Sequence, residues 1–262
     1  MKLDREHALL ERTLRAFKTR LRQLPRHVQD KGGDLGPLTE LDRHVDRELY
    51  RAIRASFAMD GWMSEESPHE PGAGRIWIVD PIDGTREIVA GVAEWAVSVG
   101  LWEGEAPVYG WLYNASRDIL WHGGPGIGAW AEEGEMRRPV RVREPGPIAN
   151  LSVGVSRTDL TRGLIPEVSP APTPIGSIAY KLGLVAAGEI DATVSLTPKN
   201  AWDIAGGIAV VLGAGGSVVS LDDGGALSLG GKTLHEGGLV AGHPEVVEEL
   251  RRRYSNKAKK GV

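Results

Sequence analysis

The chain has 262 residues, of which 41% are hydrophobic, so it is long enough to bury a large core as one domain or as two closely packed ones. Its formal net charge is −4, with acidic and basic residues interspersed, which gives no general attraction to nucleic acid or to an anionic membrane. The absence of cysteine excludes disulfides, thiolate metal sites and cysteine nucleophiles.

The N-terminal part of the chain predicts two amphipathic helices. Apolar side chains recur at helical spacing over residues 4–24 and again over about residues 38–58, with a glycine-containing loop between them. Glu65 and Glu66 then form an acidic pair in a turn at the end of this helical region. Residues 1–22 are charged throughout and lack the apolar core of a signal peptide, and no apolar run approaches the roughly 20 residues that span a bilayer. We therefore expect a soluble, cytoplasmic protein.

The pattern changes at residue 76, where short strands replace helices. Residues 76–79 form an apolar strand that ends abruptly at Asp80. Turn residues separate four further predicted strands, at 95–102, 108–113, 119–121 and 127–130. This spacing is typical of an antiparallel meander, and we interpret most of its tryptophans as core residues.

The segment Pro145-Gly146-Pro147 marks a boundary, after which strands and helices alternate. The strands are predicted at 151–156, 191–196, 216–220 and 238–242, and the helices at about 176–187, 203–213 and 244–254. The alternation indicates an α/β half that follows an α+β half. We therefore divide the chain into an N-terminal part, 1–146, and a C-terminal part, 147–262.

The segment from Asp80 to Thr85 is the most informative one for chemistry. Pro81 stiffens the turn after the strand, and Asp83 follows closely enough for both carboxylates to face one point. Two neighbouring carboxylates repel each other unless a cation compensates, and Mg²⁺ prefers such oxygen ligands. Gly84 permits close backbone approach, and Thr85 adds a hydroxyl and an N–H at the start of a helix that points toward a phosphate. Taken alone, the segment is equally consistent with a surface turn.

Other acidic positions strengthen the cation interpretation, although each has a simpler structural one. Glu65-Glu66 alone is a solvated acidic turn, and Asp203 alone is a helix cap. A polar cluster at the head of the second helix comprises Lys31, Asp34, Thr39 and Asp42. The seven histidines form no closely spaced pair, so we interpret them as structural or surface residues. We find neither a Ser-His-Asp triad nor a glycine-rich nucleotide loop.

In order and spacing these segments resemble the inositol monophosphatase superfamily over roughly residues 30–215. That superfamily includes inositol monophosphatases, 3′(2′),5′-bisphosphate nucleotidases and some fructose-1,6-bisphosphatases. The resemblance rests on residues 78–85, 202–207, 64–67 and the cluster from Lys31 to Asp42. It implies a layered αβαβα sandwich, Mg²⁺-dependent hydrolysis of a small phosphorylated metabolite at a site between the two halves, inhibition by lithium, and a homodimer.

The resemblance also implies roles for individual residues. The ligands of one Mg²⁺ are Glu65, Asp80 and the Ile82 carbonyl, and those of a second are Asp80, Asp83 and Asp203, with a weaker third ion near Glu65. Asp42 and Thr85, assisted by Glu65, orient and deprotonate the attacking water. The backbone of Gly84 and Thr85 binds the phosphate.

Two features bear on the substrate. Arg86-Glu87 and the segment that contains Ser177 and Lys181 are similar to the corresponding segments of bisphosphate nucleotidases. By that resemblance the Lys181 ammonium meets a second phosphate of the substrate. The alternative is that Lys181 is a solvated helix lysine. Before Trp202-Asp203, where inositol monophosphatases place an acid that accepts inositol hydroxyls, this chain has Lys199 and no acid. We therefore favour 3′-phosphoadenosine 5′-phosphate or a related bisphosphate over an inositol phosphate. Fructose 1,6-bisphosphate hydrolysis and a non-catalytic binding role are the further alternatives.

Overall fold

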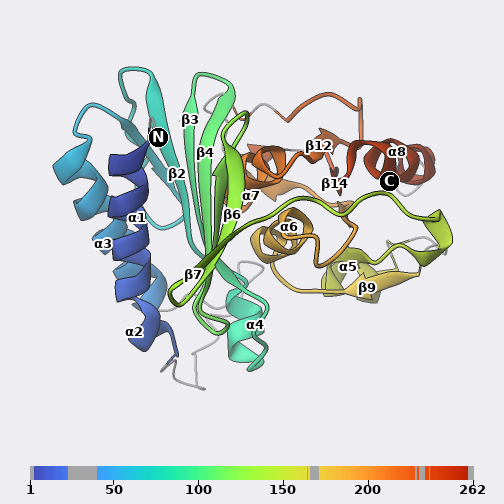
Figure 1. The fold of residues 1–262 in the computed structure, drawn as a ribbon, viewed down its shortest axis with the longest axis horizontal. Helices are drawn as coiled ribbons and strands as arrows, with labels where there is room; N and C mark the ends of the chain where they lie inside the picture. The colour runs from blue at the N-terminus through green and yellow to red at the C-terminus, as the bar shows by residue number, and fades with distance from the viewer. Residues whose placement is uncertain are drawn as a thin grey trace.

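The computed structural model describes residues 3–22, 40–163, 165, 171–227, 229, 234–235 and 237–258. Two β-sheets alternate with three layers of helices, as Figure 1 shows from left to right. This is the predicted αβαβα sandwich. Lys31, Asp34 and Thr39 of the predicted polar cluster lie outside the described residues.

The first sheet has seven strands that lie side by side in chain order. They are β1 (Gly61–Ser64), β2 (Arg75–Asp83), β3 (Ala96–Glu103), β4 (Ala106–Asn114), β5 (Ile119–Gly124), β6 (Gly128–Glu133) and β7 (Met136–Pro139). All neighbours are antiparallel except β1 and β2, so the predicted meander is confirmed and gains a strand at each edge. The sequence missed β1 and β7 because both have only four residues.

The expectation that Glu65 and Glu66 end a helical region is wrong. The preceding helix, α3 (Glu40–Ser56), stops earlier, and the chain turns into strand β1 before it reaches the two acids. Trp62 and Met63 of that strand are completely buried, and this burial rather than helix propensity decides the local structure. The acidic pair therefore follows a strand end, beside the end of β2.

Helices α1 (Asp4–Ala16), α2 (Lys18–Arg22) and α3 cover one face of the first sheet (Figure 1). The predicted helix over 4–24 is thus divided at Phe17, which lies between α1 and α2. The apolar stripes of α1 and α3 pack on the sheet around a core of leucines and tryptophans, which includes Leu10, Leu14, Leu49, Trp77 and Trp111.

Helices α6 (Ile178–Ala186) and α7 (Ala201–Gly213) fill the space between the two sheets. They are almost entirely buried, and small residues let their backbones approach the first sheet closely. A Cβ atom on Gly110 of β4 would lie only 2.1 Å from the carbonyl oxygen of Gly206 on α7. Backbone contact, rather than side-chain packing, therefore sets the distance between α7 and the first sheet.

The second sheet has the strand order β12-β14-β10-β8-β9. Its strands are β8 (Val153–Val155), β9 (Pro172–Pro174), β10 (Ala192–Ser195), β12 (Ser217–Ser220) and β14 (Leu239–Gly242), and α8 (Pro244–Ala258) covers its outer face. The shorter elements are α4 (Thr85–Val89), a 3₁₀ turn (Ile148–Asn150), α5 (Arg157–Thr161), β11 (Lys199–Asn200) and β13 (Leu234–His235).

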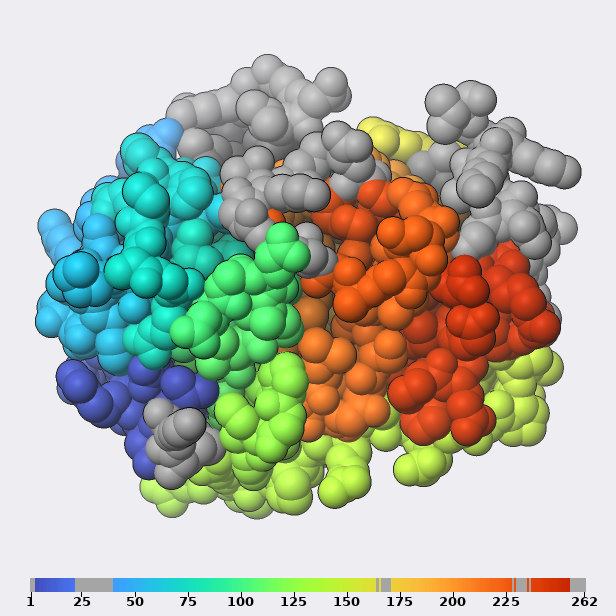
Figure 2. All heavy atoms as spheres, turned by 90° about the horizontal axis from the view of Figure 1, so that it is seen from above, coloured from blue at the N-terminus to red at the C-terminus, as the bar shows by residue number. Residues whose placement is uncertain are grey.

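In sequence, the strands of the two sheets lie on opposite sides of the predicted boundary at residues 146/147. Figure 2 shows residues of the first half, in blue to green, beside later residues in orange to red. One hydrophobic core nevertheless joins Ile78, Trp102 and Trp121 of the first sheet to Leu182 and Val211 of the inner helices. The division of the chain into two domains stays a prediction. Within the described residues, every helix is too short or too polar to cross a membrane.

Candidate active site

Strand β2 delivers two carboxylates to one point through an irregularity in its pairing. The sequence predicts a strand that ends at Asp80, but β2 continues to Asp83 with a register shift between these two residues. In a regular strand, residues three apart point to opposite faces of the sheet, and the shift removes this conflict. The Ile82 N–H donates to Asp80 Oδ1 at 2.9 Å, which holds the first carboxylate in the turn.

Glu65 reaches the same place from β1. Ser64 lies opposite Val79 in the parallel ladder, and the Glu65 N–H donates to the Val79 carbonyl at 3.3 Å. The end of β1 therefore lies directly beside Asp80. The parallel pairing, which the sequence did not predict, is what joins the two acidic segments.

Asp203 comes from the C-terminal half, on the first turn of α7. That helix begins at Ala201, two residues earlier than predicted, and Asp203 accepts the Asn200 N–H at 3.1 Å in a capping box. Ser98, which is paired with Asp80 in the sheet, donates its hydroxyl to the Trp202 carbonyl at 3.2 Å. This bond fixes the start of α7 beside β2.

These four acids, Glu65, Asp80, Asp83 and Asp203, are called the carboxylate cluster below. Burial, followed by the charges of Glu65 and Asp83, raises the pKa of Asp80 well above its usual range. Burial and Asp83 raise the pKa of Asp203 to about 7. Glu65 is the most exposed of the four, yet loss of hydration and the charge of Asp203 raise its pKa to about 8. Like charges are thus held close together without an equal number of positive charges.

The chemistry of this donor set fits divalent cations. Burial raises the pKa of Asp83 even though hydrogen bonds from Ser177 and Ala179 and the charges of Lys181 and Lys199 lower it, so these groups offset only part of the cost of burying its charge. Carboxylate oxygens at one buried point are the ligands that hard cations such as Mg²⁺ prefer. A divalent ion would restore all four acids to their charged forms.

Asp42 approaches the cluster from α3. It is buried, with 3% of its surface exposed, and its charge contributes to the raised pKa values of Glu65 and Asp80. Thr85 is the first residue of α4, and Gly84 before it has a φ of +102°. A Cβ at position 84 would lie 2.9 Å from Trp95 Cβ, so glycine is required there both for its backbone conformation and for space.

The structure places Ser177 and Lys181 behind the carboxylate cluster. Ser177 Oγ donates to Asp83 Oδ2 at 2.5 Å. Lys181 is 3% exposed, and its ammonium donates to the carbonyls of Ile175 and Gly176 at 3.1 and 3.4 Å. Lys181 is therefore not a solvated helix lysine. That either residue contacts substrate stays a prediction.

Lys199 lies in β11, immediately before α7, and is half-buried. Its ammonium donates to Thr197 Oγ1 at 2.8 Å, and Thr197 Oγ1 donates to Asp159 Oδ1 at 3.4 Å. Asp159 is fully buried on α5, so the fold brings an acid to a stretch that has none in the sequence. Sequence reasoning missed this residue because it is 38 positions away from Thr197.

A second buried polar group lies between α1 and the first sheet, and we call His7, His122 and Glu132 the histidine cluster. The two imidazole rings stack with centroids 4.2 Å apart. Glu132 Oε1 lies 3.1 Å from His122 Nε2 and 3.6 Å from His7 Nε2. The interpretation of the histidines as structural or surface residues stays a prediction, but nothing in the sequence indicated that His7 and His122 lie in contact. Their separation in sequence concealed the contact.

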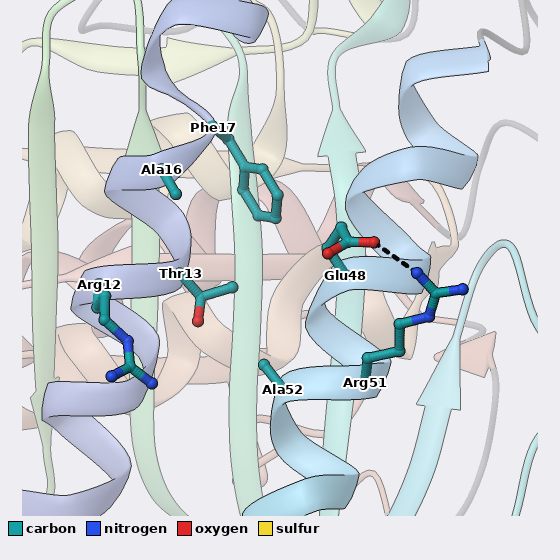
Figure 3. Close-up of a pocket in the computed structure, with 7 residues that line it drawn as sticks. All are labelled: Arg12, Thr13, Ala16, Phe17, Glu48, Arg51 and Ala52. Carbon is teal, nitrogen blue, oxygen red and sulfur yellow. Dashed lines mark hydrogen bonds and ion pairs between the residues drawn. The ribbon is translucent and has the colours of Figure 1, made fainter.

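A surface pocket of about 500 Å³ lies between α1 and α3 (Figure 3). Arg12 and Ala16 line it on α1, and Glu48 and Arg51, which pair at 3.0 Å, line it on α3. It contains no member of the carboxylate cluster. Substrate is therefore not expected there.

The chain is similar to known proteins over most of its length. A model described as the inositol monophosphatase family matches residues 6–260. The chain is 30% identical to a histidinol-phosphatase of Mycobacterium tuberculosis over 93% of this chain and 95% of that protein. It is 33% identical to the 3′(2′),5′-bisphosphate nucleotidase CysQ of Salmonella typhimurium, over 71% and 76% of the two chains. The structure of an IMPase of Thermotoga maritima has a TM-score of 0.82 at 25% identity, covering 99% of this chain and 98% of that one.

Proposed function

We propose a substrate class for this chain, which belongs to the inositol monophosphatase family and is a metal-dependent phosphomonoesterase. The proposed substrate is a nucleotide with two phosphates, of the 3′-phosphoadenosine 5′-phosphate type, from which one phosphate is removed. The family uses divalent metal ions, and we propose two to three Mg²⁺ ions as the occupants of this site.

The carboxylate cluster supplies the ligands in this proposal. Glu65, Asp80 and the Ile82 carbonyl would hold one ion, and Asp80, Asp83 and Asp203 a second. Bound Mg²⁺ would supply an acidified water as nucleophile and stabilise the charge that develops on the phosphate oxygens. The raised pKa values of these acids support the assignment, because they show how strongly the cluster disfavours its own negative charge.

The chain's own residues would handle the proton and the phosphate. Asp42 and Thr85, with Glu65, would orient the attacking water and accept its proton. Gly84 and Thr85 form the start of α4, where the first backbone N–H groups of a helix have no partner within the helix. These N–H groups would bind the phosphate oxygens.

Lys199 is the observation that carries the choice of substrate. It precedes the helix that bears Asp203, and its positive charge lowers the pKa values of both Asp83 and Asp203. Asp159 is buried beside Thr197 on one side of this segment, whereas Lys199 is only half-buried, and its ammonium also donates to the Pro198 carbonyl at 3.1 Å. A cation at this position favours a leaving group that carries a second phosphate over a neutral polyol. The 33% identity to a protein named as a bisphosphate nucleotidase supports the same choice.

The test is phosphate release by the pure protein with Mg²⁺ and four compounds at matched concentration. They are 3′-phosphoadenosine 5′-phosphate, inositol 1-phosphate, histidinol phosphate and fructose 1,6-bisphosphate. We expect at least a tenfold preference in kcat/KM for the nucleotide, about 1.4 kcal/mol of transition-state stabilisation. A preference for any of the other three would overturn the proposed substrate and leave the metal chemistry intact.

Lys199→Met tests the residue that carries the choice. The ratio of kcat/KM for the nucleotide to that for p-nitrophenyl phosphate should fall about tenfold, because only the nucleotide offers a second phosphate. Lys18→Met is the matched control, since Lys18 pairs with Asp118 in the outer helical layer at 2.6 Å. An unchanged ratio in the Lys199 variant would show that this lysine does not select the substrate.

Two further properties belong to the same proposal. Millimolar Li⁺ should inhibit phosphate release, and equal activity with and without Li⁺ would refute this.

The protein should form a homodimer, and a monomeric mass by light scattering at working concentration would exclude it.

A further inference from the structure

We infer that Ser177 is a positioning residue of the metal site, which holds one oxygen of Asp83, and that buried Lys181 fixes the backbone from which Ser177 acts. Both residues would then act through Asp83 rather than through contact with substrate. The inference rests on the metal-dependent activity but not on which phosphate ester is cleaved.

Asp83 is held by two donors that reach the same oxygen. Ser177 Oγ donates to Asp83 Oδ2 at 2.5 Å, and the Ala179 N–H donates to that oxygen at 2.7 Å. Within the described part of the chain, no hydrogen bond occupies Oδ1. The two donors therefore fix the orientation of the carboxyl group and leave its second oxygen for a cation.

The conformation of Ser177 is unusual for its residue type. Its φ is +45°, and Asp118 is the only other non-glycine residue with a positive φ among those described. Ser177 caps α6, and its Oγ accepts the Tyr180 N–H at 3.0 Å while it donates to Asp83. Strained backbone of this kind persists where the surroundings determine it, and it gathers at functional sites.

The backbone before Ser177 is pinned on both sides. The Lys181 ammonium donates to the carbonyls of Ile175 and Gly176, and the Gly176 N–H donates to Glu94 Oε2 at 2.6 Å. Lys181 lies one helical turn after Ser177, and its own N–H donates to the Ser177 carbonyl at 3.2 Å. With its ammonium bonded to two carbonyls of this segment and only 3% of the residue exposed, Lys181 is enclosed by protein.

The arrangement also joins the two halves of the molecule. Asp83 belongs to the first sheet, and Ser177 and Ala179 belong to the start of α6, which packs against α7. Since α7 carries Asp203, the bond between Ser177 and Asp83 ties the two parts that supply the second set of ligands. Ser177 thus affects the distance between the elements that carry Asp83 and Asp203, as well as the orientation of the Asp83 carboxyl group.

The experiment measures Mg²⁺ binding by titration calorimetry to chelator-stripped protein, which requires no substrate. Ser177→Ala and Ser177→Gly should each weaken Mg²⁺ affinity about tenfold or more, the effect typical of losing a partner of a metal ligand. Glycine adopts the positive φ without strain, so it separates the lost hydroxyl from the backbone conformation. Wild-type affinity in Ser177→Gly would overturn the positioning role, and thermal melts confirm that each variant is folded.

Ser156→Ala is the matched control for the loss of a helix cap. Ser156 caps α5 by accepting the Thr158 N–H at 3.2 Å, and within the described structure it makes no contact with the carboxylate cluster. Its substitution should leave Mg²⁺ affinity unchanged. An equal loss in this control would show that cap removal, not the bond to Asp83, weakens metal binding.

Lys181→Met separates positioning from substrate contact. If Lys181 acts through Ser177, kcat/KM should fall by the same factor for p-nitrophenyl phosphate and for 3′-phosphoadenosine 5′-phosphate. A loss confined to the KM of the nucleotide would overturn this role and make Lys181 a phosphate contact. A wild-type protein that binds Mg²⁺ but cleaves no nucleotide would refute the proposed substrate and leave this inference standing.

Discussion

The carboxylate cluster is partly buried and the histidine cluster is almost wholly buried, and both join elements that are far apart in sequence. Distance alone would select the wrong one as the metal site. His7, His122 and Glu132 each place a potential ligand atom within 4.8 Å of the others, as metal ligands do. Comparing the hydrogen-bond partners of the two clusters reverses that choice.

The histidine cluster has its donors and acceptors matched. Trp111 Nε1 lies 3.2 Å from His7 Nδ1, and an indole N–H only donates. Neutral His7 therefore carries its proton on Nε2, toward Glu132, where a metal would have to bind. The Tyr109 hydroxyl lies 2.8 Å from His122 Nδ1, and Arg15 donates to Glu132 Oε2 at 3.1 Å. Protons and the arginine already fill the positions that a cation would take.

The carboxylate cluster has the opposite composition. Its four acids offer acceptors and negative charge, and their raised pKa values show that the surrounding protein does not balance them. The difference teaches that a buried cluster is better classified by its unmatched charge than by its ligand spacing. A cluster with unmatched charge favours a bound ion, whereas a cluster with matched charges and hydrogen bonds stabilises the fold.

Asp80→Asn should give the largest effect. Asparagine retains an acceptor for the Ile82 N–H but removes a charge that two ions would share. We expect kcat/KM to fall by about 10³-fold, equivalent to about 4 kcal/mol. In chelator, the same variant should melt at a higher temperature than wild type, because one repulsive charge is gone. Retained Mg²⁺-dependent turnover would refute the site, and a lower melting temperature in chelator would refute the account of its charge.

Glu132→Gln should lower stability and leave activity unchanged, which is the opposite of the result expected for Asp80→Asn. It leaves Arg15 and two imidazole N–H groups facing an uncharged amide, so we expect the free energy of unfolding to fall by about 2–3 kcal/mol. The loss should be the same with Mg²⁺ and with chelator, and activity per folded molecule should not change. Glu133→Gln is the control, because Glu133 is exposed on the neighbouring position of the same strand. Wild-type stability by urea melts would show that the histidine cluster does not stabilise the fold.

The two clusters should also respond to pH with opposite signs. The raised pKa values of Glu65 and Asp203 mean that the metal-free fold loses stability as pH rises from about 4, where these acids ionise in the unfolded chain, to about 8, and regains it on acidification through the same range. Burial lowers the pKa of His122, so its protonation removes stability as pH falls below about 6.5. Hydrogen bonds from His122 and His7 lower the pKa of Glu132 despite its burial, so its protonation removes stability below about pH 4.5. Each proton changes the slope by at most about 1.4 kcal/mol per pH unit.

Urea melts of the protein in chelator, from pH 4 to 9, measure how the free energy of unfolding changes with pH. In chelator, stability should rise as pH falls from about 8 to about 5, because Glu65 and Asp203 together outweigh His122 in this range. Saturating Mg²⁺ should remove this rise, so that stability instead falls as pH drops below about 6.5. The same direction of change under both conditions would contradict the division into two clusters.

The sequence predicted the parts of the site that are local and missed those that depend on pairing. Asp80 and Asp83 lie in one short motif, so their chemistry was readable without a structure. The register shift that aims them together depends on β3, and the position of Glu65 depends on a four-residue parallel strand. Neither feature leaves a periodic signal in the sequence.

The same reason explains the helices and the histidines. Amphipathic stripes predicted α1 and α3, and small apolar residues predicted the buried α7 with an error of two residues at its start. His7 and His122 have 114 residues between them (122 − 7 − 1), so only the packing of α1 on the sheet could reveal their contact. The sequence left Lys181 as either a phosphate contact or a solvated helix lysine, because its partners are backbone carbonyls, which leave no signal in the residue types.

The position of Asp203 on α7 has a consequence for the order of events during synthesis. It follows Asp83 by 120 residues (203 − 83), so the ribosome adds it roughly 6–24 s later at about 5–20 residues per second. Throughout that interval a nascent chain has three of the four acids and lacks the fourth, and for most of it the chain also lacks Ser177 and Ala179, which donate to Asp83. Tight uptake of magnesium would then begin only when the C-terminal half has docked, which makes the ion a reporter of completed folding.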